Sequence, residues 1–114
     1  MAILKKKLEK LITISEKVNI IRNMRIINHI TQETMANYLH YTRIEYNRKE
    51  RQNEYNLYIY LKLAILYNIN ISYLLGISNN IIKLTQEERD NIIRLYNINE
   101  KEVNNIILHD IIYV

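Results

Sequence analysis

Four polar side chains near the middle of the chain carry hydrogen-bonding groups that match the edges of nucleic-acid bases. Arg43, Asn47 and Arg48 lie close together in sequence, and Gln32 precedes them. Arginine can bind guanine O6 and N7 in bidentate fashion, and asparagine can do the same for adenine N6 and N7. A glutamine in the first turn of a helix can donate to a phosphate, because the helix N-terminus also favours an anion. Each residue alone is also typical of a solvated surface, so the interpretation depends on the elements that carry it.

Two short helices, over 32–39 and 43–50, are predicted to hold these side chains. Thr31 and Thr42 are suitable N-caps for them, and the segment 40–42 is a break between them. Such a pair can place one helix in the major groove of DNA while the other crosses the backbone. Similar helix pairs are also common in ordinary helical bundles.

The apolar residues of the two helices predict how they pack. Met35, Ala36 and Leu39 are expected to point inward, and the small Ala36 allows two crossing helices to approach closely. An inward Tyr46 would leave the polar side chains of the second helix on an exposed arc. Arg25, earlier in the chain, is expected either to pair with an acid inside the fold, Glu33 or Glu50, or to contact DNA.

Further helices are predicted on both sides of this pair from apolar residues at helical spacing. They cover 3–14, 16–30, 56–67, 71–76, 85–96 and 100–109. The apolar set of helix 56–67 is Leu57, Tyr60, Leu61, Ala64 and Tyr67. The expected N-caps are Asn56, Asn70, Thr85 and Asn99, of which Thr85 and Asn99 have the spacing of a capping box with Glu88 and Glu102. Gly76, the only glycine, is expected to end the helix before it.

The fragment LYNIN occurs twice, at 66–70 and 95–99. Each copy predicts a helix end, an Asn that stops the helix, an Ile that fills a gap in the core and an Asn that caps the next helix. The flanking sequences do not repeat, so we interpret the two copies as one local solution used twice. The final residues, 111–114, are compatible with a helical extension or with a strand that pairs with a partner chain.

Composition favours a single all-α domain. The chain has 114 residues, of which 48% are hydrophobic, with one glycine, no proline and no cysteine. Without cysteine there is no disulfide, thiolate nucleophile or thiolate metal site. No stretch is long and apolar enough for a signal peptide or a membrane span, so a soluble cytoplasmic protein is expected.

Charge is unevenly distributed along the chain. Residues 1–83 carry thirteen Lys and Arg against six Asp and Glu, whereas residues 84–114 carry three against six. The resulting +7 and −3 suggest a polyanionic partner for the basic part, although a solvated surface explains the same numbers. The acidic part has apolar stripes that either pack on its own domain or form a dimer interface. These stripes consist of Ile92 or Ile93, Tyr96, Val103, Ile106, Ile107 and Ile111.

Catalytic and metal-binding patterns are not found in the sequence. His29, His40 and His109 are far apart, and none has a second ligand at helical spacing. There is no nucleophile with a neighbouring base, no fixed pair of carboxylates and no glycine-rich phosphate loop. We therefore expect no enzyme, no metal and no cofactor. The ten tyrosines are expected to replace Phe in and around the core.

From about Ile20 to Gly76 the chain resembles the phage-repressor type (Xre-like, Cro-like) helix-turn-helix family of DNA-binding proteins. The residues that carry the resemblance are Ile21-Arg22, Met24-Arg25, Ile30-Thr31-Gln32-Glu33, Ala36, Leu39, Thr42-Arg43, Glu50, Leu57, Leu61-Lys62-Leu63-Ala64 and Asn68-Ile69-Asn70-Ile71-Ser72-Tyr73-Leu74-Leu75-Gly76. The resemblance implies a five-helix helix-turn-helix domain over 16–78. An extra N-terminal helix over 1–15 and a C-terminal helical pair over 79–114 would complete the chain.

The resemblance also implies a set of DNA-facing residues, with Gln32 and Thr42 on phosphate and the others nearer the bases. This set is Gln32, Thr42, Arg43, Ile44, Asn47 and Arg48. The chain departs from the family where His40 replaces the usual glycine of the turn, so that His40 must accept a positive φ or reshape the turn. It also has Ile44 and Glu45 at positions near the bases, where Ile can contact a thymine methyl and Glu can accept from cytosine N4.

Together these features predict a sequence-specific, DNA-binding transcription regulator of the phage or mobile-element repressor kind. It would bind double-stranded operator DNA as a homodimer, through the C-terminal segment or the N-terminal helix. The alternative is a protein–protein interaction module on the same scaffold, antitoxin-like or a co-regulator.

Overall fold

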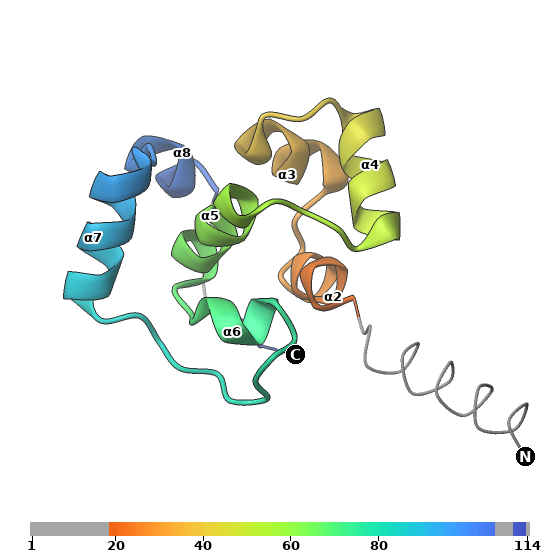
Figure 1. Ribbon diagram of the computed structural model, residues 1–114. Helices are drawn as coiled ribbons and strands as arrows, with labels where there is room; N and C mark the ends of the chain where they lie inside the picture. Colours follow the sequence, from red (N-terminus) through yellow and green to blue (C-terminus); the bar gives the residue numbers. More distant parts are fainter. Residues whose placement is uncertain (1–18, 107–110, 114) are drawn as a thin grey trace, which may run out of the picture.

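The computed structural model describes residues 19–106 and 111–113, and every regular element among them is an α-helix (Figure 1). In chain order they are α2 (Ile20–Ile27), α3 (Gln32–Leu39), α4 (Arg43–Gln52), α5 (Leu57–Tyr67), α6 (Ile71–Leu74), α7 (Gln86–Tyr96) and α8 (Glu100–Asn104). The predicted all-α class is confirmed for this part of the chain. The helix predicted over 1–15 lies outside the described residues. None of the described helices has the length and apolar character needed to cross a membrane.

Helix α5 lies at the centre of the molecule (Figure 1). Helices α2, α3 and α4 lie on one side of it, α7 and α8 lie on the other, and α6 packs against it (Figure 1). Ile59 and the seven consecutive residues 61–67 of α5 are buried, which is typical of a helix surrounded by others. The stripe predicted for this helix was therefore too narrow, and Leu57, one of its expected members, is exposed.

Short polar side chains begin most of these helices. The hydroxyl oxygens of Thr31, Thr42 and Thr85 each accept from the backbone N–H of the third helical residue, and Thr85 forms the predicted capping box with Glu88. Asn56 caps α5 as predicted. The capping box predicted for Asn99 is wrong, because the Asn99 side chain accepts from the backbone N–H of Lys101 and the Glu102 carboxylate lies elsewhere.

Left-handed residues end several helices in place of glycine. His40 has φ 61°, so it accepts the positive φ that its position demands. Asn53, Asn68 and Asn97 have φ between 52° and 54°. Asparagine tolerates this region better than most residues, so a chain with a single glycine can still stop its helices sharply. Gly76 follows the C-cap of α6 with φ 77°, as expected of a helix stop.

The second LYNIN copy has the predicted local structure, and the first differs from the prediction only at its last residue, Asn70, which makes no capping bond. Asn68 and Asn97 are left-handed C-caps, and the next residues, Ile69 and Ile98, are buried in the core. The final Asn of each copy stands at the N-cap position of α6 or α8, although Asn70 bonds to Ser72 and to the backbone at residues 80 and 82 rather than capping. The repeat therefore turns the chain sharply while fixing one Ile in the core.

Four predicted helix ends are wrong. Helix α2 ends at Ile27 rather than at 30. Helix α4 continues through Gln52, and α6 ends at Leu74. Helix α8 ends at Asn104 rather than at 109.

Residues 111–113 are not helical. There the backbone N–H of Ile112 donates to Asn28 Oδ1 at 2.8 Å, and its carbonyl accepts from Asn28 Nδ2 at 2.9 Å. A pair of hydrogen bonds to the distant side chain of Asn28 is therefore found where the helical extension was considered.

The C-terminal helices pack on their own domain. Ile98 and Val103 are buried in the common core, and Ile92, Ile93, Ile106 and Ile111 pack against it. Leu95 and Tyr96 at the end of α7 remain exposed. The apolar stripes of this segment are therefore used mostly within the chain.

Replacing Ile98 by Ala should destabilise the whole domain, because the lost side chain leaves a cavity between α7, α8 and the core. We expect a loss of about 2–4 kcal/mol in the free energy of unfolding, measured by urea denaturation. Leu95→Ala, at a side chain that is 72% exposed, is the control and should change the value by less than about 0.5 kcal/mol. Equal effects of the two substitutions would show that the C-terminal helices are not part of the core.

Candidate nucleic-acid interface

Helix α4 is fixed at its N-terminus by Thr42. The Thr42 Oγ1 accepts from the backbone N–H of Glu45 at 3.1 Å and donates to Glu45 Oε1 at 2.9 Å. The Glu45 carboxylate therefore folds back on the helix start, where the helix dipole stabilises an anion. The cap uses the Thr42 hydroxyl as both acceptor and donor. A phosphate near Thr42 would therefore be bound by the neighbouring backbone rather than by the Thr42 side chain.

Five of the predicted DNA-facing residues converge on one surface. Gln32 from α3 and Arg43, Ile44, Asn47 and Arg48 from α4 line a surface cavity of about 300 Å³. Arg51, which the sequence placed in a link after the helix, lines it too because α4 extends further than expected. Arg51 lies three residues after Arg48, so a correct prediction of the helix end would have placed both arginines on the same face of α4.

The outer part of this surface is both cationic and apolar. Arg43, Arg48 and Arg51 are exposed, and the Ile44 side chain is 83% exposed between them. Tyr46 on the opposite side of α4 is fully buried, as predicted. The arc predicted for α4 is therefore present, with the guanidinium groups and one branched apolar side chain facing solvent.

Gln32 and Asn47 form a polar contact between the two helices. The Gln32 side-chain amide donates to Asn47 Oδ1 at 3.2 Å and to Glu50 Oε1 at 3.3 Å. Both hydrogens of that amide are thus used inside the protein. This contact holds the side-chain oxygen of Asn47 toward α3. Gln32 can still bind an anion through its backbone N–H, which lies at the start of α3.

A buried ion pair supports the surface from below. Arg25 Nε and Nη2 donate to the two oxygens of Glu50 at 2.8 and 2.9 Å, and Arg25 Nη1 donates to the carbonyl of Ile30 at 2.9 Å. Tyr46 donates its hydroxyl to the same carboxylate. Arg25 and Glu50 are 9% and 1% exposed. Of the alternatives for Arg25, the structure therefore selects the internal pair with Glu50.

The surroundings of Glu50 favour its charged form. Burial alone would raise the pKa of Glu50, but the hydrogen bonds from Arg25, Tyr46 and Gln32 together with the Arg25 charge hold this pKa below its usual value. The same contact raises the pKa of Arg25. Burial raises the pKa of Tyr46, so its hydroxyl remains a donor.

No protein-family model matches the chain, and no match is found among curated proteins or solved structures. The chemistry of this surface is therefore argued from its own residues. Among the described residues, no cluster of His, Asp and Glu has the arrangement needed to hold a metal ion.

Replacing Glu50 by Gln should destabilise the fold by about 3–5 kcal/mol in urea denaturation at neutral pH, because Arg25 would stay buried without its counter-ion. Glu54→Gln, at an exposed position nearby, is the matched control and should have little effect. Equal stability of the two variants would contradict the supporting role of the ion pair.

The same ion pair predicts an acid-sensitive stability. Because the folded-state pKa of Glu50 is lowered, its stabilisation is complete above the unfolded-state value of about 4.3 and disappears as pH falls through the folded-state value. The free energy of unfolding of the native chain should therefore fall below about pH 4 more steeply than that of Glu50→Gln. Parallel curves for the two proteins would contradict this assignment.

Proposed function

We propose that the chain is a DNA-binding transcription regulator in which α3, the segment 40–42 and α4 act as a helix-turn-helix unit. The observation that carries the proposal is the convergence of three arginines, Ile44 and Asn47 on the outer face of α4. The fold over α2–α6 would then be the five-helix phage-repressor-like domain implied by the sequence resemblance.

In this proposal α4 enters the major groove with its N-terminal half nearest the bases. Arg43 and Arg48 donate to guanine or to phosphate, and the exposed methyl groups of Ile44 meet a thymine methyl. Asn47, oriented by Gln32, faces adenine. The backbone N–H groups at the start of α3 bind a phosphate, and Arg51 adds a further cationic contact.

A homodimer is part of the proposal because one short recognition helix offers few base contacts. Two copies on half-sites about 10 base pairs apart would double those contacts. Repression would follow where the operator overlaps a promoter. Sedimentation equilibrium with a duplex selected from random DNA for binding to the native chain should give two chains per duplex, and one chain per duplex would remove the dimer from the proposal.

An interaction module for another protein is the second candidate function. The observation that favours it is the 83% exposure of Ile44 beside three arginines, because arginine is enriched at protein–protein interfaces and a partner could cover the apolar side chain. A mobility shift with random duplex DNA distinguishes the two candidates. DNA binding predicts a complex at low salt whose affinity falls steeply as salt rises, whereas no complex at micromolar protein and low salt would favour the module.

Replacing Arg43 by Ala should weaken binding to a duplex selected from random DNA by about 1–3 kcal/mol and relax the base preference at one position. Fluorescence anisotropy against the selected duplex and its single-base variants measures both effects. Arg94→Ala, on α7 at the other side of α5, is the matched control that removes one positive charge away from the proposed interface (Figure 1). Equal losses for the two variants would remove Arg43 from the set of base contacts.

A further inference from the structure

The central helix carries a buried lysine that the DNA-binding proposal does not use. Lys62 is 2% exposed, and its ammonium group donates to the carbonyl of Tyr38 and lies 4.5 Å from the centre of the Tyr38 ring. A buried ammonium group requires a counter-charge, because desolvation strongly disfavours an isolated ion. Glu102 supplies it from α8, with its Oε2 atom 3.2 Å from Lys62 Nζ.

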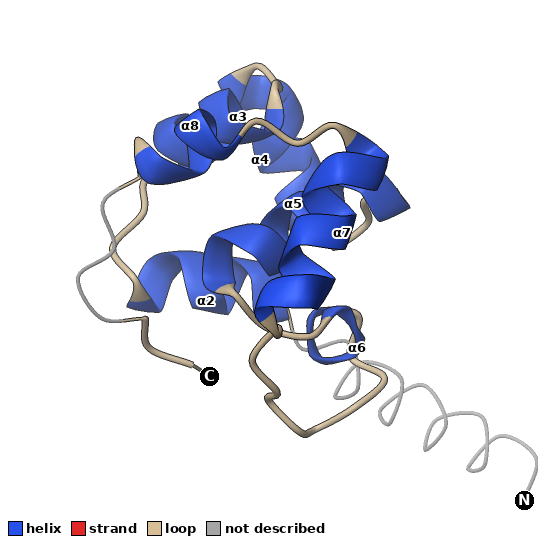
Figure 2. Ribbon diagram, turned by 90° about the vertical axis from the view of Figure 1, so that its left-hand side faces the viewer, coloured by secondary structure: helices blue, strands red, loops and turns tan. Residues whose placement is uncertain are grey.

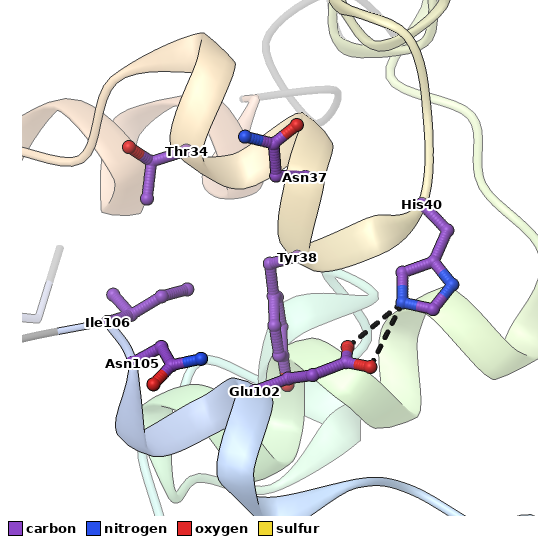
Figure 3. Close-up of a pocket in the computed structure, with 7 residues that line it drawn as sticks. All are labelled: Thr34, Asn37, Tyr38, His40, Glu102, Asn105 and Ile106. Atoms are coloured by element: carbon purple, nitrogen blue, oxygen red, sulfur yellow. Dashed lines mark hydrogen bonds and ion pairs between the residues drawn. The ribbon is translucent and has the colours of Figure 1, made fainter.

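The same carboxylate also contacts the segment between α3 and α4. His40 Nε2 lies 3.1 and 2.9 Å from the two oxygens of Glu102, which points from α8 toward α3 (Figure 3). His40 is the left-handed C-cap of α3 and directly precedes Tyr41 and the cap residue Thr42. Glu102 thus joins the core at α5 to the segment that precedes α4. Helix α8, which carries Glu102, is drawn near α3 in Figure 2.

The contact with Glu102 helps to explain how His40 keeps its backbone conformation. At φ 61° a residue with a side chain has a higher conformational energy than glycine. The backbone there is held by the Tyr41 N–H, which donates to the carbonyl of Ala36 at 2.9 Å. A side-chain anchor on His40 offsets the cost and restrains the segment 40–42. The contacts of His40 and Lys62 also hold the pKa of Glu102 below its usual value against the opposing effect of burial.

We propose that Glu102 is a positioning residue through which α8 holds the segment 40–42, and with it α4, in the geometry that binds DNA. The proposal rests on the proposed function for its effect on DNA, whereas its effect on the backbone at 40–42 does not depend on DNA. Because the His40 contact is partly exposed, its loss should change the measured equilibria by about two- to fivefold.

Three variants separate positioning from simple stabilisation. Glu102→Ala removes both contacts and should lower stability as well as affinity, because Lys62 stays buried and charged. Lys62→Met combined with Glu102→Ala removes both members of the buried pair, together with the His40 contact, and should restore much of the stability. His40→Asn keeps a residue that tolerates a positive φ but removes the imidazole, so it should leave the Lys62 pair intact.

Two readouts test these variants: anisotropy with the selected duplex, and hydrogen exchange of the Tyr41 amide. We expect the combined variant and His40→Asn each to bind DNA about two- to fivefold more weakly than the native chain, with Tyr41 exchange faster by a similar factor. Joining His40→Asn to Glu102→Ala should add no further loss, because both remove the same contact between His40 and Glu102. Leu95→Ala, exposed on α7, is the control for the C-terminal segment.

Native affinity and native Tyr41 exchange in either the combined variant or His40→Asn would overturn the proposal and leave Glu102 only a stabilising partner of Lys62. A native chain that binds no duplex would overturn the proposed function instead. In that case Tyr41 exchange in the two variants still decides whether Glu102 positions the segment.

Discussion

The buried carboxylate of Glu50 is the interaction on which the candidate surface depends. Arg25 from α2, Gln32 from α3 and Tyr46 from α4 all donate to it, so one anion fixes three helices relative to one another. A bidentate guanidinium contact has a narrow range of acceptable geometries, whereas apolar packing tolerates small shifts. The ion pair therefore sets the direction of α4 more strictly than the surrounding side chains could.

A second carboxylate, Glu102, contacts the segment 40–42 that precedes α4, and we propose that it also positions this helix. Glu50 lies on α4 itself and is fully enclosed, whereas Glu102 belongs to α8 and remains partly exposed. Loss of the first contact breaks the packing of α2 to α4. Loss of the second leaves that packing in place and acts on the segment 40–42. In this proposal Glu50 fixes α4 from within the helix, and Glu102 acts on it more weakly through the segment that precedes it.

The sequence predicts well those features that depend on neighbouring residues. Thr31, Thr42 and Thr85 cap helices through bonds that span three positions, and these caps are found where expected. Glu102 has the same spacing from Asn99, yet its partners are His40 and Lys62, which are 62 and 40 positions away. A local pattern cannot reveal a distant charge that competes for the same carboxylate. The burial of Lys62 was missed for the same reason, since Tyr38 of α3 and Glu102 of α8, both distant in sequence, enclose it.

The residues of the α4 surface suggest a class of partner, a polyanion, more clearly than they suggest a particular DNA sequence. Three arginines favour any polyanion, and their attraction depends on salt more than on sequence. Selectivity has to come from the side chains with fixed shape, Ile44 and Asn47. Asn47 is already oriented by Gln32, and Glu45 is drawn back to Thr42, which keeps its charge at the helix start. The internal bonds of the surface therefore limit which bases α4 could distinguish, before any contact with DNA is made.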